Sequence, residues 1–235
     1  MITPTEYKAF LHNNFGSAAP LVAQAYPISA FNSSPYPAFT AMSEIITDVS
    51  YFCPAHRALN LAVKNGVPAW TYLWNHTPSC SWSPSIPRQA LQLLQATHTA
   101  EIPFVFGNLD KLPLPNGWCN LTAPEVEISA TLISAWTAMA ATGDPSASSG
   151  LQWPRYNPVG LVGINIGNST ITVGVVDYTV CKFWDTLDAT VLNFTAAGHG
   201  ALTAISAAGR SIPQPQLGVK IVLLAMFGGL IALVR

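Results

Sequence analysis

A helical pattern followed directly by a short apolar strand constrains the fold of this chain more than any other feature of its sequence. Residues 54–64 carry apolar side chains on one helical face, and Gly66 stands where it can end the helix. Residues 67–74 then have the composition of a short apolar strand. Because a helix followed by a strand is half of an α/β unit, the sequence predicts an α/β fold.

The sequence predicts two further helices from the signals at their N-termini. Residues 3–6 form a capping box with a proline at the first helical position, which predicts a helix of about three turns that ends at Gly16. The sequence Thr-Ala-Pro-Glu at residues 122–125 opens a longer helix, which Gly143 and Pro145 terminate. The side chains expected on the buried face of this helix are Val126, Ile128, Leu132, Ile133, Trp136 and Met139.

A β-hairpin is expected after the long helix. Residues 162–166 and 170–173 are largely apolar and flank a Gly-Asn-Ser sequence at 167–169, which is typical of a turn between two strands. The chain has 235 residues, enough for one domain of ordinary size with an appendage but short for two domains.

Charge is scarce in this chain. Charged residues make up 9% of it, against about 25% in an average soluble protein, while hydrophobic residues reach 50%. Disordered chains are rich in charge and poor in apolar residues, so the composition excludes disorder. The net charge of −1 provides no basic field to hold a phosphate backbone, which argues against nucleic-acid binding. The surface must be wetted by uncharged polar residues or by attached sugar.

Five N-glycosylation sequons occur where chance would give about two. Their asparagines are Asn32, Asn75, Asn120, Asn168 and Asn193. The four cysteines are Cys53, Cys80, Cys119 and Cys181. They lie far apart, without the close pairs that zinc sites and redox motifs use, so two disulfides are expected, with free buried thiols as the alternative. Sequons and disulfides together predict a secretory-pathway protein that is secreted or held at the cell surface.

The two ends of the chain differ in what they indicate. Residues 1–6 contain neither the basic nor the apolar region of a signal peptide. Residues 221–234 are uncharged and strongly apolar, and counting from 217 gives about 18 residues, near the lower limit for a spanning helix. Small residues at 206–209 and a polar spacer at 211–216 also fit a GPI signal. A transmembrane helix and a removable GPI signal both stay open, and a buried core helix is the alternative.

The segment His-Thr-Ala-Glu-Ile-Pro-Phe-Val-Phe-Gly at residues 98–107 resembles the catalytic-histidine segment of type B carboxylesterases, the cholinesterase-like branch of the α/β-hydrolases. Further segments resemble the last third of that family in the same order, at residues 48–57, 70–76, 136, 142–145, 153–156 and 181–185. The sequence around Cys80 and Cys119 is similar in style to that of fungal members.

The resemblance implies the C-terminal part of an α/β-hydrolase fold, with an incomplete sheet and covering helices. The apolar composition of the last residues adds a C-terminal apolar helix. Three parts are therefore expected. Residues 1–187 form the carboxylesterase-like part, residues 188–216 are a linker of small and polar residues, and residues 217–235 are the hydrophobic anchor segment.

The resemblance implies that His98 is the general base and acid of a catalytic triad. In such a triad the imidazole takes the proton of a serine hydroxyl and returns it to the leaving alkoxide. The other histidines, His12, His56, His76 and His199, lie outside this motif, and His76 occupies a position that resembles a family scaffold residue. Glu101 is expected either to orient the His98 loop or to act as a capping or solvated residue. The aromatic residues near His98, among them Trp74, Trp82 and Phe104, are expected in the core.

The remaining catalytic groups are not found in the sequence. No G-x-S-x-G nucleophile elbow occurs, and the nearest serines, Ser169 and Ser211, fit ordinary loops. Glu6 and Glu44 do not match the motif of the triad acid. We therefore expect the chain alone to be inactive as an esterase. A gene model that starts at an internal methionine would explain both these absences and the missing signal peptide.

For the disulfides, the resemblance implies that Cys53 pairs with Cys181, which leaves Cys80 to pair with Cys119 across the His98 segment. The sequential pairing of Cys53 with Cys80 and Cys119 with Cys181 stays open.

Two function classes remain. The first is a serine carboxylesterase or lipase-like enzyme that acts on small-molecule carboxylic esters without a cofactor or metal. The second is a non-catalytic cholinesterase-like glycoprotein of the cell surface.

Overall fold

The computed structural model describes residues 2–82, 86, 88–108, 120–147, 150–187 and 230–234. They divide into two compact units. The first is drawn from Met1–Ser50 and Thr179–Ala225, and the second from Tyr51–Tyr178 and Met226–Arg235.

The described part of the first unit is helical. Its helices are α1 (Pro4–Phe15), α2 (Ala19–Ala25), α3 (Pro37–Thr47) and the helical residues 179–187. The predicted capping box is confirmed, because the Thr3 hydroxyl accepts from the Glu6 amide while the Glu6 carboxylate accepts from the Thr3 amide. The helix ends at Gly16, whose φ of +53° suits a residue without a Cβ.

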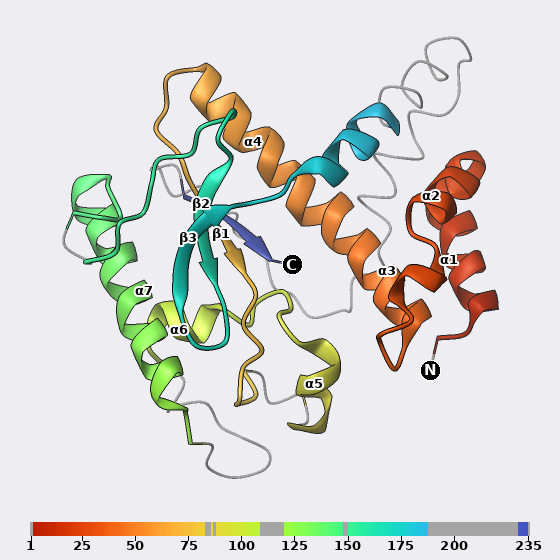
Figure 1. Ribbon diagram of the computed structural model, residues 1–235, viewed down its shortest axis with the longest axis horizontal. Coiled ribbons are helices and arrows are strands. Elements are labelled where there is room, and N and C mark those ends of the chain that lie inside the picture. Colours follow the sequence, from red (N-terminus) through yellow and green to blue (C-terminus); the bar gives the residue numbers. More distant parts are fainter. Residues whose placement is uncertain are drawn as a thin grey trace, which may run out of the picture. The chain divides into compact units, whose positions relative to one another are not determined.

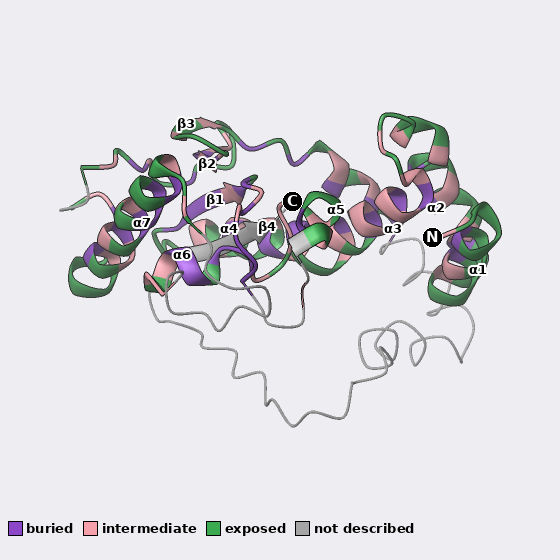
Figure 2. Cartoon of the chain, turned by 90° about the horizontal axis from the view of Figure 1, so that it is seen from below, coloured by how far each residue is buried: buried purple, intermediate pink, exposed green. Residues whose placement is uncertain are grey.

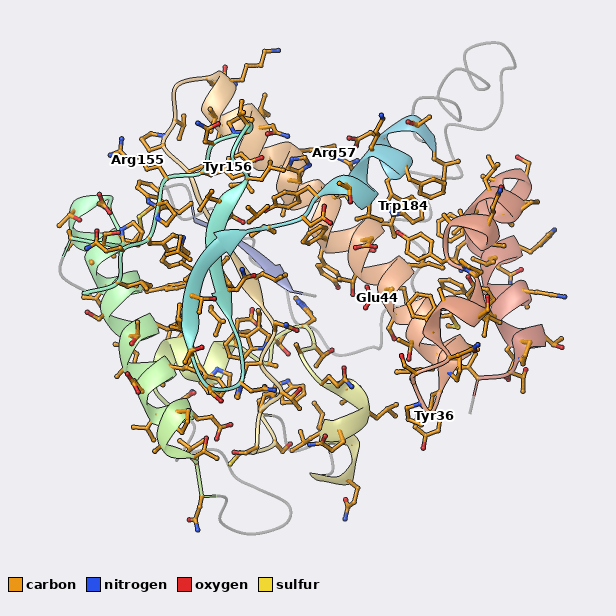
Figure 3. The ribbon with its side chains drawn as sticks, viewed as in Figure 1. Tyr36, Glu44, Arg57, Arg155, Tyr156 and Trp184 are labelled. Atoms are coloured by element: carbon orange, nitrogen blue, oxygen red, sulfur yellow. The ribbon has the colours of Figure 1, made fainter. Side chains whose placement is uncertain are left out.

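A buried tyrosine links the segments of the first unit. The Tyr7 hydroxyl donates to the Tyr26 carbonyl oxygen at 2.6 Å, and the Tyr26 hydroxyl donates to Asp48 Oδ2 at 2.8 Å. Trp184, labelled in Figure 3, donates its indole N–H to the Tyr26 hydroxyl at 2.7 Å. Burial, and then the charge of Asp48, raise the pKa of Tyr26 far above its usual range. These contacts attach residues 179–187 to the N-terminal helices.

The second unit contains the sheet. Its elements are α4 (Cys53–Lys64), β1 (Trp70–Trp74), α5 (Leu91–Leu94), α6 (Ile102–Phe106), α7 (Ala123–Thr142), β2 (Val162–Ile166), β3 (Ile171–Val175) and β4 (Leu230–Val234). The π-helical turn Asp48–Phe52 precedes α4. The predicted helix before Gly66 and the predicted hairpin are confirmed, while the predicted strand begins at Trp70 rather than at residue 67.

The sheet has the strand order β3-β2-β1-β4 (Figure 1). Strand β1 pairs in parallel with both β2 and β4, and β2 pairs antiparallel with β3. The parallel pairing of β1 and β2 needs a crossover, which α5, α6 and α7 provide. The α/β fold predicted from the sequence is therefore confirmed.

One face of β1 builds the core. Trp70, Tyr72 and Trp74 alternate along the strand, are almost fully buried, and pack with residues of β2, α6 and α7. The remaining buried members of this core are Trp82, Leu91, Ala100, Phe104, Ile128, Leu132, Ala135, Trp153, Ile164 and Ile166. Figure 2 shows buried residues along β1 and β2 and exposed residues on the outer side of α7.

The opposite face of β1 is covered as well. Thr71 is fully buried, and its hydroxyl hydrogen-bonds the Tyr178 hydroxyl at 2.9 Å. The Tyr178 ring stacks on His56 of α4 with ring centroids 4.1 Å apart. Strand β1 is thus an interior strand with both faces buried, as parallel α/β sheets require.

The predicted buried face of α7 is wrong at two positions. Ile128 and Leu132 are buried, and Trp136 and Met139 pack against the core, as expected. Val126 is 54% exposed and Ile133 is 39% exposed. At 3.6 residues per turn these two side chains point to the side of the helix opposite Ile128 and Leu132. The true buried face is completed by Ser129, Ala135 and Ala138.

The expected apolar helix at the C-terminus requires a correction. Within residues 217–235, the structure describes only Leu230–Val234, and these form the parallel strand β4 beside β1. Leucine, isoleucine and valine suit a parallel strand, and β1 needs a neighbour on that edge. In the described part of the chain, no helix combines the length and apolar character needed to cross a membrane. The expected linker, residues 188–216, lies outside the described residues.

Candidate active site

His98 lies in a turn between α5 and α6, after strand β1, as the sequence predicts. Its side chain is exposed, and within the described residues no hydrogen bond reaches its ring. Loops that a rigid sheet positions are the usual place for catalytic side chains, because solvent and substrate reach them there.

Tyr51 covers one face of the His98 ring. The two rings are stacked, with centroids 4.7 Å apart and planes 27° apart. Tyr51 belongs to the π-helical turn Asp48–Phe52, and such turns occur frequently at functional sites. Partial burial lowers the pKa of His98, which favours the neutral imidazole that a general base requires. Tyr51 lies in the segment 48–57, which resembles the family, but the sequence did not predict its contact with His98.

The backbone after His98 has a conformation that branched residues rarely adopt. Thr99 has φ +72°, in the left-handed region, which costs of order 1–3 kcal/mol for a residue that is not glycine. The indole N–H of Trp82 donates to the Thr99 hydroxyl at 3.2 Å. Trp82 is itself buried in the core, so this bond connects the unusual backbone of the His98 turn to a fixed part of the unit.

Glu101 is buried three residues after His98. It is 9% exposed, and its Oε2 has no hydrogen-bond partner within the described residues. Burial raises the pKa of its carboxyl group. Glu101 is the N-cap residue of α6, but its side chain makes no capping hydrogen bond. The solvated and capping alternatives are therefore wrong, and its action on the His98 loop stays a prediction.

The aromatic residues near His98 belong to the core. Trp74 and Phe104 are fully buried, with ring centroids 5.0 Å apart, and Trp82 is 7% exposed. The expectation that these residues form core rather than pocket is confirmed.

His76 is held in a buried polar cluster. Its Nε2 lies 3.1 Å from Glu125 Oε1, and its Nδ1 lies 3.1 Å from Asn168 Oδ1. The Glu125 carboxylate also accepts hydrogen bonds from Ser79 and Thr122. Burial alone would raise the pKa of Glu125, but the hydrogen bonds from His76, Ser79 and Thr122 outweigh it and hold that pKa well below its usual range. Because Ser79 contacts the carboxylate and not the imidazole, this cluster has a structural arrangement rather than that of a triad.

The other described histidines have separate environments. His12 is exposed on α1, and His56 is stacked on Tyr178 and hydrogen-bonded to Asn60. His199 lies outside the described residues. Ser169 is exposed in the turn between β2 and β3. Within the described ranges, no group of three or more His, Cys, Asp and Glu side chains is placed to bind a metal ion.

The structure confirms disulfide bonding. Cys53, Cys80 and Cys181 are each disulfide-bonded, and none of the described cysteines is free. The pairing of the four cysteines, including Cys119 outside the described residues, stays a prediction.

Four of the five predicted glycosylation sites can be located. Asn32, Asn75, Asn120 and Asn168 are all exposed, and Asn193 lies outside the described residues.

The parallel strands, the covering helices and the turn after β1 are consistent with part of an α/β-hydrolase fold. A sequence profile described as the carboxylesterase family matches residues 17–184. This chain belongs to the carboxylesterase family.

Its relatives include esterases from animals and bacteria. The chain is 32% identical over 164 residues to acetylcholinesterase from Gallus gallus, a match covering 68% of this chain and 20% of that protein. It is 34% identical over 113 residues to para-nitrobenzyl esterase from Bacillus subtilis, covering 48% of this chain and 20% of that enzyme. With fumonisin B1 esterase from Sphingopyxis macrogoltabida, it shares 28% identity over 189 residues, covering 77% of this chain and 32% of the relative. The chain thus spans about a fifth to a third of these relatives.

Proposed function

We propose that this chain is the histidine-bearing, C-terminal portion of a serine carboxylesterase that hydrolyses carboxylic esters. The observation that carries the proposal is the position of His98. The residue lies in a segment that resembles the family's catalytic-histidine segment, on a turn after β1, and its exposed side chain is stacked on Tyr51.

The proposed chemistry is acyl transfer through a serine. The His98 imidazole accepts the proton of the serine hydroxyl as the oxygen attacks the ester carbonyl carbon, and then donates it to the departing alkoxide. Water, activated by the same imidazole, releases the acid from the acyl-enzyme. The lowered pKa of His98 supports this role because more of the imidazole is neutral near pH 7.

The serine and the triad acid of this reaction are not recognisable in the 235 residues. We therefore propose that this chain is inactive when it is alone. Its activity would require the polypeptide that supplies these groups.

A route through the secretory pathway is part of the proposal. The four exposed sequon asparagines and the disulfide-bonded cysteines support it. We also propose, from the sequence alone, an esterase part at residues 1–187 and a linker at 188–216. The surface anchor expected at 217–235 is not part of this proposal, because Leu230–Val234 pair with β1 in the sheet.

The test starts from the transcript upstream of Met1, which is sequenced and expressed beside the 235-residue chain. We expect the longer product to hydrolyse p-nitrophenyl butyrate and to react with a fluorophosphonate probe, and the shorter chain to do neither. In the longer product, His98→Gln should lower kcat by about 10⁴-fold or more.

His12→Gln is the matched control, because His12 is an exposed histidine on α1, and its variant should keep the full rate. An upstream reading frame without a nucleophile elbow, or full activity in His98→Gln, would refute the proposal.

A second function is supported by one observation. The exposed sequons suit a non-catalytic, cholinesterase-like glycoprotein of the cell surface as well as they suit an enzyme. Under this alternative, the native product contains no nucleophile and does not react with the fluorophosphonate probe at any concentration.

A further inference from the structure

Three glycosylation sequons meet at one end of the sheet. The sequon at residues 75–77 directly follows β1, the one at 120–122 directly precedes α7, and the one at 168–170 forms the turn between β2 and β3. The end of β1, the start of α7 and this turn lie together in Figure 1. All three sequon asparagines are exposed.

Hydrogen bonds join these three sequons. The second residue of the first sequon, His76, and the third residue of the second sequon, Thr122, both bond to the buried carboxylate of Glu125. His76 and Thr77 also bond to the side chain of Asn168. The Glu125 cluster is therefore the common centre of the three sequons.

The orientation of the Asn168 side chain follows from its partners. The backbone N–H of Thr77 can only donate, and it lies 2.8 Å from Asn168 Oδ1. The oxygen of the carboxamide must therefore face residues 76–77, since the nitrogen carries only donors. The Asn168 Nδ2 points away from Thr77, and within the described residues the structure records no hydrogen bond for it.

This orientation suits an N-linked glycan. The sugar is attached to Nδ2 and the carbonyl oxygen remains an acceptor, so glycosylation preserves both hydrogen bonds to Oδ1. Ser169 and Thr170 are exposed as well, which leaves room around the linkage. The linkage amide would then be fixed by the His76 ring and the Thr77 backbone N–H instead of rotating freely.

We infer that Asn168 is an N-glycan attachment site with a linkage amide immobilised by residues 76–77, within a glycan patch that Asn75 and Asn120 complete. The inference rests on the proposed secretory route. Glycans at this end of the sheet would cover the entry into α7 and the β2–β3 turn.

The experiment expresses the chain through the secretory pathway of a eukaryotic host and maps the occupied sites by mass spectrometry. Release by peptide N-glycosidase F in H₂¹⁸O marks each occupied asparagine. We expect label at Asn75, Asn120 and Asn168. Thr170→Ala should remove the label at Asn168 alone, and Thr170→Ser should keep it.

The immobilised linkage has a separate readout. In the native chain, release of the Asn168 glycan should be about tenfold slower than release at Asn32, because two hydrogen bonds must open first. After denaturation, the two rates should become equal. If the glycans at Asn168 and Asn32 are released at equal rates from the native chain, the linkage amide of Asn168 is not immobilised.

Asn32, in the first unit, distinguishes failure of the inference from failure of the proposed route. Label at Asn32 without label at Asn168 would overturn the inference and leave the secretory route standing. Absence of label at every site would overturn both.

Discussion

Among single residues, Glu125 combines burial with an ionised state. The carboxylate is 1% exposed and is satisfied by donors from His76, Ser79 and Thr122. The pKa of Glu125 is lower in the folded chain than in the unfolded chain, where a glutamate titrates near pH 4.3. The group therefore stabilises the fold fully above about pH 5, and this contribution is lost as the pH falls.

We expect Glu125→Gln to reduce the free energy of unfolding by about 3 kcal/mol at pH 7, because it leaves donors of a buried cluster without their charged acceptor. The variant should also lose stability less steeply than the parent chain between pH 5 and pH 3. Urea unfolding followed by tryptophan fluorescence at several pH values measures both effects.

Glu127→Gln is the control for this prediction, since Glu127 is an exposed residue of the same helix. If the parent chain and Glu125→Gln lose the same stability between pH 5 and pH 3, Glu125 does not stabilise the fold as an ionised group.

Tyr51 should control the acidity of His98. The stacked ring shields one face of the imidazole, and partial burial lowers the pKa of His98. Tyr51→Ala should therefore raise this pKa toward its ordinary value, while Tyr51→Phe keeps the ring and leaves the pKa unchanged. An NMR titration of the His98 Cε1–H signal compares the variants. If Tyr51→Ala leaves the pKa of His98 unchanged, the prediction is wrong and atoms other than the Tyr51 ring bury the imidazole.

Among the elements, β1 and β2 approach each other too closely for a side chain at one position. A Cβ at Gly163 would lie 2.5 Å from Thr71 Cγ2 and 2.6 Å from the Thr71 carbonyl oxygen. Because a backbone atom cannot move aside cheaply, Gly163→Ala should destabilise the sheet by about 2 kcal/mol.

Gly160→Ala is the control for the Gly163 substitution, because its nearest new neighbour, Val162 Cγ2, would be at an ordinary 3.6 Å. The difference between the urea midpoints of the two variants measures the effect. Equal midpoints would show that β2 shifts to accommodate the methyl group.

The sequence predicted elements well where local signals mark their ends. The capping box at Thr3 and the turn at residues 167–169 act within a few residues, so their elements appear where expected. The exposure of Val126 and Ile133 could not be predicted by counting apolar residues, because α7 carries them around most of its circumference. Which side of α7 is buried depends on its packing against the sheet and α6.

Only part of the candidate site could be predicted from the sequence, for the same reason. A local motif predicted that His98 lies in a loop after the strand, as it does, and its catalytic role stays a prediction. The stacking of Tyr51 on His98 joins residues 47 positions apart in the chain. Likewise, the conformation of Thr99 and its hydrogen bond to Trp82 depend on packing that no short pattern encodes.

At the scale of the whole molecule, β1 determines how the sheet is completed. Both its faces are buried, and both its edges are paired, with β2 on one side and β4 on the other. An interior parallel strand requires two neighbours, since an open edge invites pairing with other chains. The apolar composition of the last residues predicts a helix, because a run of apolar residues does not reveal that a distant strand has a free edge.

The polar cluster around Glu125 also has a kinetic consequence. The amides of Thr77, Ser79 and Thr122 lie outside helices and strands, yet each donates to an oxygen of this cluster. They should exchange with deuterium slowly and at a common rate, because each becomes accessible only when the cluster opens as a unit. The amide of Val159 is the comparison, since it donates to Asn157 Oδ1 in an exposed turn and should exchange rapidly. These three loop amides are up to 45 positions apart in the chain. They would then report one local unfolding event, in which the segment after β1 separates from the start of α7.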